Sequence, residues 1–275
     1  MTSERLSDEQ YWESIYRSQD PAKGVTVTAA ASGRSGYFRP YSEFFLWDVI
    51  LEQYFSALKD ASIVELGSAP GDFLVRIKNR FHLDPYGAEY TASGAELNKN
   101  IFEANGIDPG QVIRADFLSA DFQDRFRERF DAVISRGLLE HFNDLENVVE
   151  KHLNLLKPKG LIVISIPNFL GFNGFLQRIF NAEILKIHNL KIMEPAEFSK
   201  LFAKNTRLKT LFCGHYGVFD LNIFYAPKHT LPYFLLVLIR SLQLVLNPVF
   251  RLLFGKKGNE SRAFSPYLIY IGRKL

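Results

Sequence analysis

Short apolar runs alternate with amphipathic stretches from residue 61 onward, and this alternation restricts the fold more than any other feature of the chain. The helical stretches are residues 71–81, 92–105, 121–128 and 143–157. The apolar runs between them are residues 62–66, 86–89, 111–115, 132–135 and 161–166. Strands that alternate with helices predict βαβ units, which build a parallel sheet with helices on both faces. We therefore predict a doubly wound α/β fold.

The pattern continues beyond this core. Residues 194–204 predict another helix, 206–216 a sixth strand and 265–273 a seventh, alternating strand. Two stretches, 168–190 and 217–264, do not follow the alternation of strands and helices. We interpret them as insertions in a single domain that spans 60–275.

Residues 1–59 precede the regular pattern and are assigned to N-terminal helices and a lid. A short helix is predicted at 7–19, followed by a loop rich in Gly, Ser, Ala and Thr at 20–40 and a second helix after Pro40. The side chains that we expect to fold over a bound ligand are Tyr11, Trp12, Arg34 and Tyr37.

Composition limits the class of protein. An apolar share of 47%, with 25 Phe among 275 residues, can supply a sizeable core. Cys213 is the single cysteine, which excludes an internal disulfide and a thiolate metal cluster. Residues 1–10 are polar and charged, so we expect no secretory signal peptide. These features favour the reducing cytoplasm.

Charge is distributed unevenly along the chain. Residues 221–275 hold eight of the 33 Lys and Arg but only one of the 30 Asp and Glu. Residues 1–220 are therefore mildly acidic. A nucleic-acid binder needs a broad basic face, so we expect no nucleic-acid partner. The basic C-terminal fifth needs a separate explanation.

A bend of small residues joins the first predicted strand directly to a helix, in the sequence Ile-Val-Glu-Leu-Gly-Ser-Ala-Pro-Gly-Asp at 63–72. Gly67 and Gly71 let a ligand approach the backbone, and the helix start offers free N–H groups. The spacing Gly-x-x-x-Gly is neither the dinucleotide fingerprint nor a phosphate loop. The carboxylate of Glu65 would repel a pyrophosphate but attract an ammonium group.

Acids also end the next two strands. Glu89 ends the second, 24 residues after Glu65, where a carboxylate can bind both hydroxyls of a ribose. Asp116 ends the third, where its side chain could accept a hydrogen bond from an adenine amine. The carboxyl ends of parallel strands share the edge at which such folds bind ligands. Together the three acids predict a cationic, adenosine-containing ligand without phosphates, and S-adenosylmethionine meets that description.

In these motifs the chain resembles the class I methyltransferases. Their glycine motif is similar to residues 65–71, and their segment past the methionine end of the cofactor is similar to 130–142. The resemblance implies a Rossmann-like, seven-stranded, mostly parallel sheet of order 3-2-1-4-5-7-6, with S-adenosylmethionine as cofactor and S-adenosylhomocysteine as product. The cofactor-binding residues that it implies are Glu65, Gly67, Ser68, Ala69, Gly71, Glu89, Tyr90, Asp116, Phe117 and Arg136.

A closer likeness, to the ubiquinone-biosynthesis O-methyltransferases, lies in residues 188–198 and 214–217. Those enzymes act on polyprenylated phenols and lie against membranes. This chain departs from them in its N-terminal region and in the long insert after residue 217, which leaves its acceptor open.

Transfer of a methyl group to a hydroxyl requires removal of a proton, and histidine is the commonest base for this task. His141 follows the fourth strand at the edge where the methyl group is expected, so we take it as the catalytic residue. His188 and His215 are alternatives in segments that should approach the acceptor. We assign no metal site, although Glu140, His141 and Asp144 together offer ligands for a divalent cation.

Residues 231–254 combine a wide apolar face with a narrow polar stripe of Arg240, Gln243, Asn247 and Arg251. The longest apolar run has nine residues, whereas a membrane-spanning helix needs about 20. Such a face favours lipid, a partner subunit or the protein's own core. The flanking cations favour peripheral contact with an anionic membrane, and a homodimer interface or an internally packed lid are the alternatives.

We therefore expect an enzyme that O-methylates a small lipophilic or glycan-linked acceptor, in the cytoplasm or at a membrane surface. The Asn-Pro-Pro-Tyr signature of amino-group methylation is absent at 135–138, but transfer to a sugar amine remains a rival. A cofactor-binding scaffold without catalysis and an NAD-dependent oxidoreductase are rivals of other classes. The intact set of acids and the glycine spacing argue against both.

Overall fold

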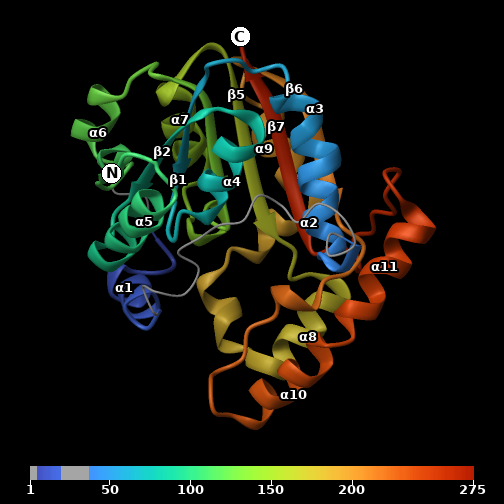
Figure 1. Cartoon of the computed structure of the whole chain (residues 1–275). Coiled ribbons are helices and arrows are strands. Elements are labelled where there is room, and N and C mark those ends of the chain that lie inside the picture. The colour runs from blue at the N-terminus through green and yellow to red at the C-terminus, as the bar shows by residue number, and fades with distance from the viewer. Residues whose placement is uncertain (1–4, 20–36) are drawn as a thin grey trace.

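The computed structural model describes residues 5–19 and 37–275, and its centre is a seven-stranded sheet of order β3-β2-β1-β4-β5-β7-β6 (Figure 1). β7 runs antiparallel to β5 and β6, and the other pairs are parallel. This confirms the expected fold and strand order. The strands are β1 (Ser62–Leu66), β2 (Asp84–Glu89), β3 (Val112–Arg114), β4 (Phe130–Arg136), β5 (Leu156–Pro167), β6 (Leu208–Tyr216) and β7 (Tyr267–Lys274).

Helices bury both faces of this sheet, because successive strand residues point to opposite sides. In β1, Ile63 packs in the cluster that contains Trp47, and Val64 packs in the cluster that contains Phe130. The helices of the first cluster are α2 (Tyr41–Phe45), the π-helical segment η2 (Leu46–Leu51), α3 (Glu52–Phe55), α4 (Asp72–Phe81) and α5 (Ala92–Ala104). Those of the second are α6 (Ala120–Arg125), α7 (Leu145–Leu155) and α9 (Pro195–Ala203). Double-sided burial explains why the strands are nearly continuous apolar runs.

The N-terminal helix α1 (Glu9–Arg17) lies against α5. Asp8 begins α1 by accepting a hydrogen bond from the backbone N–H of Tyr11 at 2.8 Å. Glu13 attaches the helix, because its carboxylate accepts from the backbone N–H of Ser93 at 3.0 Å and from its hydroxyl at 2.5 Å. Most of the predicted loop lies outside the described residues, and so does Arg34.

The two predicted insertions carry most of the remaining helices. Figure 1 shows α8, α10 and α11 gathered at the end of the sheet where β7 begins, which is the carboxyl edge of the parallel strands. The helical segments here are α8 (Gly171–Asn181), α10 (Leu231–Arg240), α11 (Gln243–Phe254) and the 3₁₀ turns η5 (Glu183–Ile187), η6 (Leu190–Met193) and η7 (Leu221–Ile223).

The pair α10 and α11 turns its polar stripe toward the protein. Gln243 accepts a hydrogen bond from the backbone of Leu221 at 2.9 Å, and Asn247 donates one to the carbonyl of Phe38 at 3.0 Å. The opposite, apolar face is exposed, with Leu252 85% accessible to solvent. The alternative of an internally packed lid is therefore wrong for this segment.

Within residues 5–19 and 37–275, no single helix is long and apolar enough to cross a membrane. The pair α10–α11, bent by 42°, has the length and apolar composition of a membrane span only when its two helices are taken together.

Candidate active site

A cavity of about 250 Å³ opens where the carboxyl ends of β1, β2 and β4 meet. It brings together side chains or backbone from separate parts of the sequence. Seven of the eleven predicted site residues line it: Gly67, Ala69, Glu89, Tyr90, Phe117, Arg136 and His141. The other four, Glu65, Ser68, Gly71 and Asp116, lie outside its lining.

The glycine bend is shaped by packing as well as by ligand access. Gly67 has φ +70° and donates its N–H to the carbonyl of Ala88 at 2.9 Å. Gly71 has φ +105°, and a Cβ there would lie 2.2 Å from Oδ1 of Asn98. Asn98 also donates to Oγ of Ser68 at 2.6 Å. Ser68 and Gly71 therefore hold the bend against α5, while Gly67 and Ala69 face the cavity.

Glu89 is the best-positioned of the predicted acids. One carboxylate oxygen accepts from the backbone N–H of Thr91 at 2.9 Å and from its hydroxyl at 2.7 Å. Thr91 in turn begins α5. Burial raises the pKa of Glu89, and the hydrogen bonds from Thr91 oppose that rise. The turn between β2 and α5 thus aims a rigid carboxylate at the cavity, as a ribose-binding acid requires.

Glu65 is 2% exposed and lies beside Arg136 at the ends of β1 and β4. Nε of Arg136 donates to Oε1 of Glu65 at 2.9 Å, and the guanidinium lies 3.7 Å above the ring of Phe73. Burial raises the pKa of Glu65 to about 7, although the charge of Arg136 opposes this. The acid is therefore a buried partner of a cavity residue.

Asp116 pairs with the N-terminal segment. The guanidinium of Arg5 donates to Oδ1 of Asp116 at 2.6 Å and lies 4.8 Å above the ring of Tyr90. Leu118 donates its backbone N–H to the same oxygen at 3.0 Å. Phe117, the next residue after Asp116, lines the cavity. Sequence reasoning missed Arg5, because no local pattern relates it to a residue 111 positions away.

The N-terminal segment forms one wall of the cavity. The backbone N–H of Leu6 donates to the carbonyl of His141 at 2.8 Å. Trp12 packs edge-on against the His141 ring at 5.1 Å and donates to Oγ of Ser7 at 2.9 Å. Trp12 was an expected lid residue and lines the cavity, together with the unexpected Tyr16. Tyr37 is 60% exposed and does not line it.

A second cavity of about 840 Å³ adjoins the first, and seven residues line both. The shared residues are Trp12, Tyr16, Ala69, Arg136, Gly137, His141 and Tyr225. Apolar and aromatic side chains such as Ile15, Ile166 and Ile184 form much of the larger wall. Buried Gln177 of α8 holds the Tyr225 backbone through hydrogen bonds of 2.9 and 3.0 Å. Sequence reasoning also missed Tyr225, which lies in the stretch 217–264 that does not fit the strand–helix alternation.

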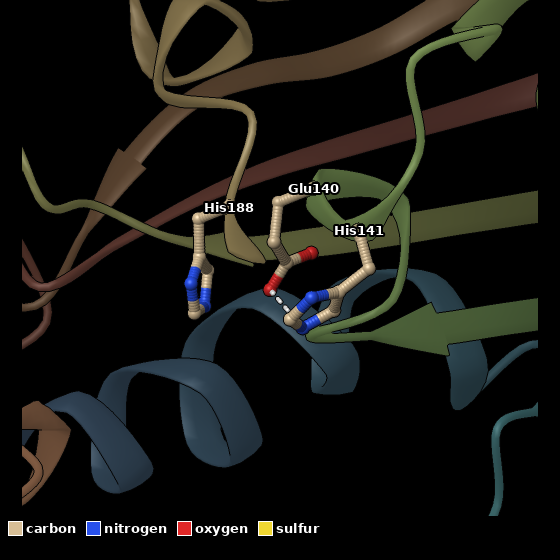
Figure 2. Close-up of side chains that lie close together, drawn as sticks. All are labelled: Glu140, His141 and His188. Atoms are coloured by element: carbon tan, nitrogen blue, oxygen red, sulfur yellow. Dashed lines mark ion pairs between the residues drawn. The ribbon is translucent and has the colours of Figure 1, made fainter. Parts of the chain in front are cut away.

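His141 lies where the two cavities join, with Glu140 and His188 beside it (Figure 2). One ligand atom from each of these three residues lies within 4.8 Å of the other two. Asp144, which we had grouped with Glu140 and His141, instead accepts from the backbone N–H of Asn147 at the start of α7. His215, the other alternative base, lines neither cavity.

The family model of a methyltransferase domain matches residues 39–205, which is more than half of the chain. The chain belongs to this methyltransferase family. No curated protein matches it. Family, fold and strand order together identify an S-adenosylmethionine-dependent methyltransferase, as expected.

Solved structures share the fold of this methyltransferase at low sequence identity. Geranyl diphosphate C-methyltransferase from Streptomyces coelicolor A3(2), solved with Mg²⁺, geranyl diphosphate and S-adenosyl-L-homocysteine, is 16% identical, with TM-score 0.52 over 85% of this chain and 78% of its own. A Galdieria sulphuraria protein proposed to be a sarcosine dimethylglycine methyltransferase is 15% identical, with TM-score 0.55 over 97% of both chains. A Thermotoga maritima methyltransferase proposed to act on histamine nitrogen is 16% identical, with TM-score 0.50 over 86% and 92%.

Residues in and beside the smaller cavity of the methyltransferase match parts of the expected cofactor. Gly67 exposes backbone where a larger side chain would press on Leu138, whose Cδ1 lies 3.2 Å from a Cβ built on Gly67. Glu89 offers a fixed carboxylate for ribose hydroxyls. Among residues 5–19 and 37–275, Oε2 of Glu65 is buried and has no hydrogen-bond partner, which suits the ammonium group of the methionine moiety.

Proposed function

We propose that the methyltransferase O-methylates a lipophilic small molecule that it takes from a membrane surface. The observation that carries this proposal is the large, mostly apolar cavity that joins the cofactor cavity at His141. An acceptor in that cavity would be held mainly by apolar contacts, and its hydroxyl would meet His141 at the junction. This position is the natural one for the reacting oxygen.

The chain's residues would align the reactants and exclude water, because the bound cofactor supplies a methyl group already activated by its sulfonium. His141 supports this assignment through its tautomer. Its Nδ1 lies 2.7 Å from the carbonyl of Ile187, and since a carbonyl only accepts, Nδ1 carries the proton. Burial lowers the pKa of His141 to about 3. The ring is therefore neutral and weakly basic. Its Nε2 can accept a hydrogen bond from the acceptor hydroxyl and take the proton as that oxygen gains the methyl group, because the proton then becomes acidic.

The helices α10 and α11 expose their apolar face and bury their polar face, and this arrangement supports membrane contact. Their exposed side chains include Leu238 and Leu252, while polar side chains of the same helices face inward. Lys228, Lys256 and Lys257 are exposed beside this face. An apolar helical face flanked by lysines fits the interface of an anionic bilayer. Lys228 also lines the large cavity, so the acceptor could enter directly from lipid.

Acceptor chemistry is tested with S-adenosylmethionine carrying a labelled methyl group. We expect label in the lipid fraction when the enzyme is incubated with phenolic and polyprenylated alcohol acceptors, and none in water-soluble amines. His141→Ala should lower kcat by about 100-fold or more, as loss of a general base does, and leave cofactor affinity within a few fold. Label appearing on amines instead would support the rival, a sugar-amine N-methyltransferase, in which Glu140 would hold the amine.

Membrane contact is tested by flotation with vesicles that contain phosphatidylglycerol. Leu252→Glu should abolish binding, whereas Ala104→Glu, which adds the same charge to the exposed end of α5, should leave it unchanged. Raising the salt by about 0.2 M should weaken binding. If the wild-type chain stays in solution and sediments as a dimer that Leu252→Glu dissociates, this face is a subunit interface.

A further inference from the structure

Glu140, His141 and His188 come from two separate segments that are tied together. Glu140 and His141 belong to the 3₁₀ turn η4 (Leu139–His141), and His188 follows η5. The backbone N–H of Asn189 donates to the carbonyl of Glu140 at 2.6 Å, and its side chain donates to the carbonyl of Phe142 at 3.2 Å. These bonds hold the second segment in place, so the three side chains meet in a prepared arrangement.

Both imidazoles are fixed in the same tautomer. Nδ1 of His188 lies 2.6 Å from the carbonyl of Ile184, as Nδ1 of His141 does from that of Ile187. Each Nδ1 therefore carries a proton, and each Nε2 keeps its lone pair. Metal-binding histidines usually donate their second N–H to a carbonyl or carboxylate in this way.

Glu140 completes the set. Its side chain is 1% exposed, and Oε2 has no hydrogen-bond partner within the described part of the chain. Oε1 lies 4.0 Å from Nε2 of His141, and Figure 2 shows the carboxylate pointing into the space between the two rings. A buried carboxylate without a counter-charge is costly. A cation bound between the three side chains would remove that cost.

We propose that Glu140, His141 and His188 bind one divalent transition-metal cation of the Zn²⁺ type. Two imidazoles and one carboxylate are a donor set that suits Zn²⁺ or Co²⁺, whereas Mg²⁺ and Ca²⁺ prefer oxygen ligands. With bonds of about 2.1 Å, tetrahedral ligand atoms lie about 3.4 Å apart. The present separations of up to 4.8 Å therefore need only small side-chain rotations.

A further ligand to the cation would come from the large cavity, because all three residues line it. An acceptor oxygen bound there would lose its proton to solvent more readily, since a metal lowers the pKa of a bound hydroxyl. His141 would then act as a ligand, and the cation would activate the hydroxyl in place of a base. This consequence rests on the proposed function, whereas binding of the cation does not.

The test is a titration of the untagged, EDTA-treated full chain with Co²⁺, whose visible absorption reports its coordination. We expect one equivalent to bind, to be displaced by Zn²⁺ and to resist an excess of Mg²⁺. His188→Ala and Glu140→Gln should each weaken binding by more than about 100-fold, beyond the loss typical of an outer-shell change. His229→Ala, which removes an exposed histidine outside both cavities, should bind as the wild type does.

Thermal unfolding gives a second measurement. Zn²⁺ should raise the Tm of the wild type and of His229→Ala but not that of His188→Ala, because only a ligand bound to the folded state stabilises it. Absence of stoichiometric Co²⁺ binding by the wild-type chain would overturn the proposal, even if the variants fail to fold. The titration contains neither cofactor nor acceptor, so a failure to bind Co²⁺ would not bear on the proposed methylation. Conversely, a protein that binds the metal but forms no labelled lipid would contradict only the proposed function.

Discussion

Nε of Arg136 donates a hydrogen bond to Oε1 of Glu65 over 2.9 Å, joining the ends of two neighbouring strands next to the cofactor cavity. The other oxygen of Glu65 is buried without a hydrogen-bond partner in the described residues. The pair therefore places an incompletely satisfied carboxylate directly behind Arg136, which lines the cavity. This relationship leads to a prediction about pH.

Cofactor affinity should rise with pH from about 6 to about 8. Burial raises the pKa of Glu65 to about 7, Arg136 opposes the rise, and Asp72 and Glu89 add to it. Below pH 7 the free enzyme holds much of Glu65 protonated, and an ammonium beside the carboxylate must displace that proton. Titration calorimetry in buffers of different ionisation enthalpy measures both the affinity and the proton released. Glu65→Gln should flatten the pH profile, whereas Glu103→Gln, on the exposed part of α5, should retain it.

The contribution of Glu65 to the stability of the cofactor-free protein should fall with rising pH, whereas cofactor affinity rises. Because the pKa of Glu65 is raised above its unfolded value, its contribution to folding is complete below about pH 4.5 and is lost as pH rises through about 7. Urea unfolding with and without S-adenosylhomocysteine separates the two effects. A cofactor affinity that falls between pH 6 and 8 would contradict the assignment of Glu65.

Glu89→Ala should weaken cofactor binding by about 100-fold, the equivalent of two hydrogen bonds to a charged group. The side chain lines the cavity and is held rigidly by Thr91. Glu103→Ala is the matched control. Calorimetry gives the affinity, and circular dichroism checks that α5 is intact. A loss smaller than threefold would place the ribose elsewhere.

Gly71→Ala should destabilise the fold more than Gly106→Ala, although both glycines have positive φ. The added Cβ at Gly71 meets Oδ1 of Asn98 at 2.2 Å, whereas no atom of the described residues lies within 4 Å of one at Gly106. Backbone strain alone costs about 1–2 kcal/mol, and the collision should bring the first variant to about 2–4 kcal/mol. Urea denaturation measures both. Equal losses would mean that α5 shifts freely away from the bend.

Glu13→Ala should release α1 from α5, because Glu13 accepts both hydrogen bonds from Ser93. Trp12 and Tyr16 of the same helix line the cofactor cavity. We expect faster amide hydrogen exchange across α1 and a cofactor affinity lower by several fold, with little change in global stability. Glu9→Ala, at an exposed position of α1, is the control. Unchanged exchange in α1 would mean that other contacts hold the helix.

Local patterns in the chain predicted the strands, their helices and the glycine bend. Apolar periodicity and the backbone conformation of a tight bend both depend on residues that are close together in the sequence. The alternation at 62–66 and 132–135 became β1 and β4. The acid Glu89 could likewise be placed at the sheet edge, since a strand end determines where its last side chain lies.

Contacts between distant segments could not be predicted in this way. Arg5 with Asp116 and His188 with His141 are separated by 111 and 47 positions, and no periodic pattern relates them. The sequence also showed that 231–254 has two faces but not which face would lie inward. Tertiary structure decided this, because buried hydrogen bonds from Gln243 and Asn247 require partners that only the folded chain brings within reach.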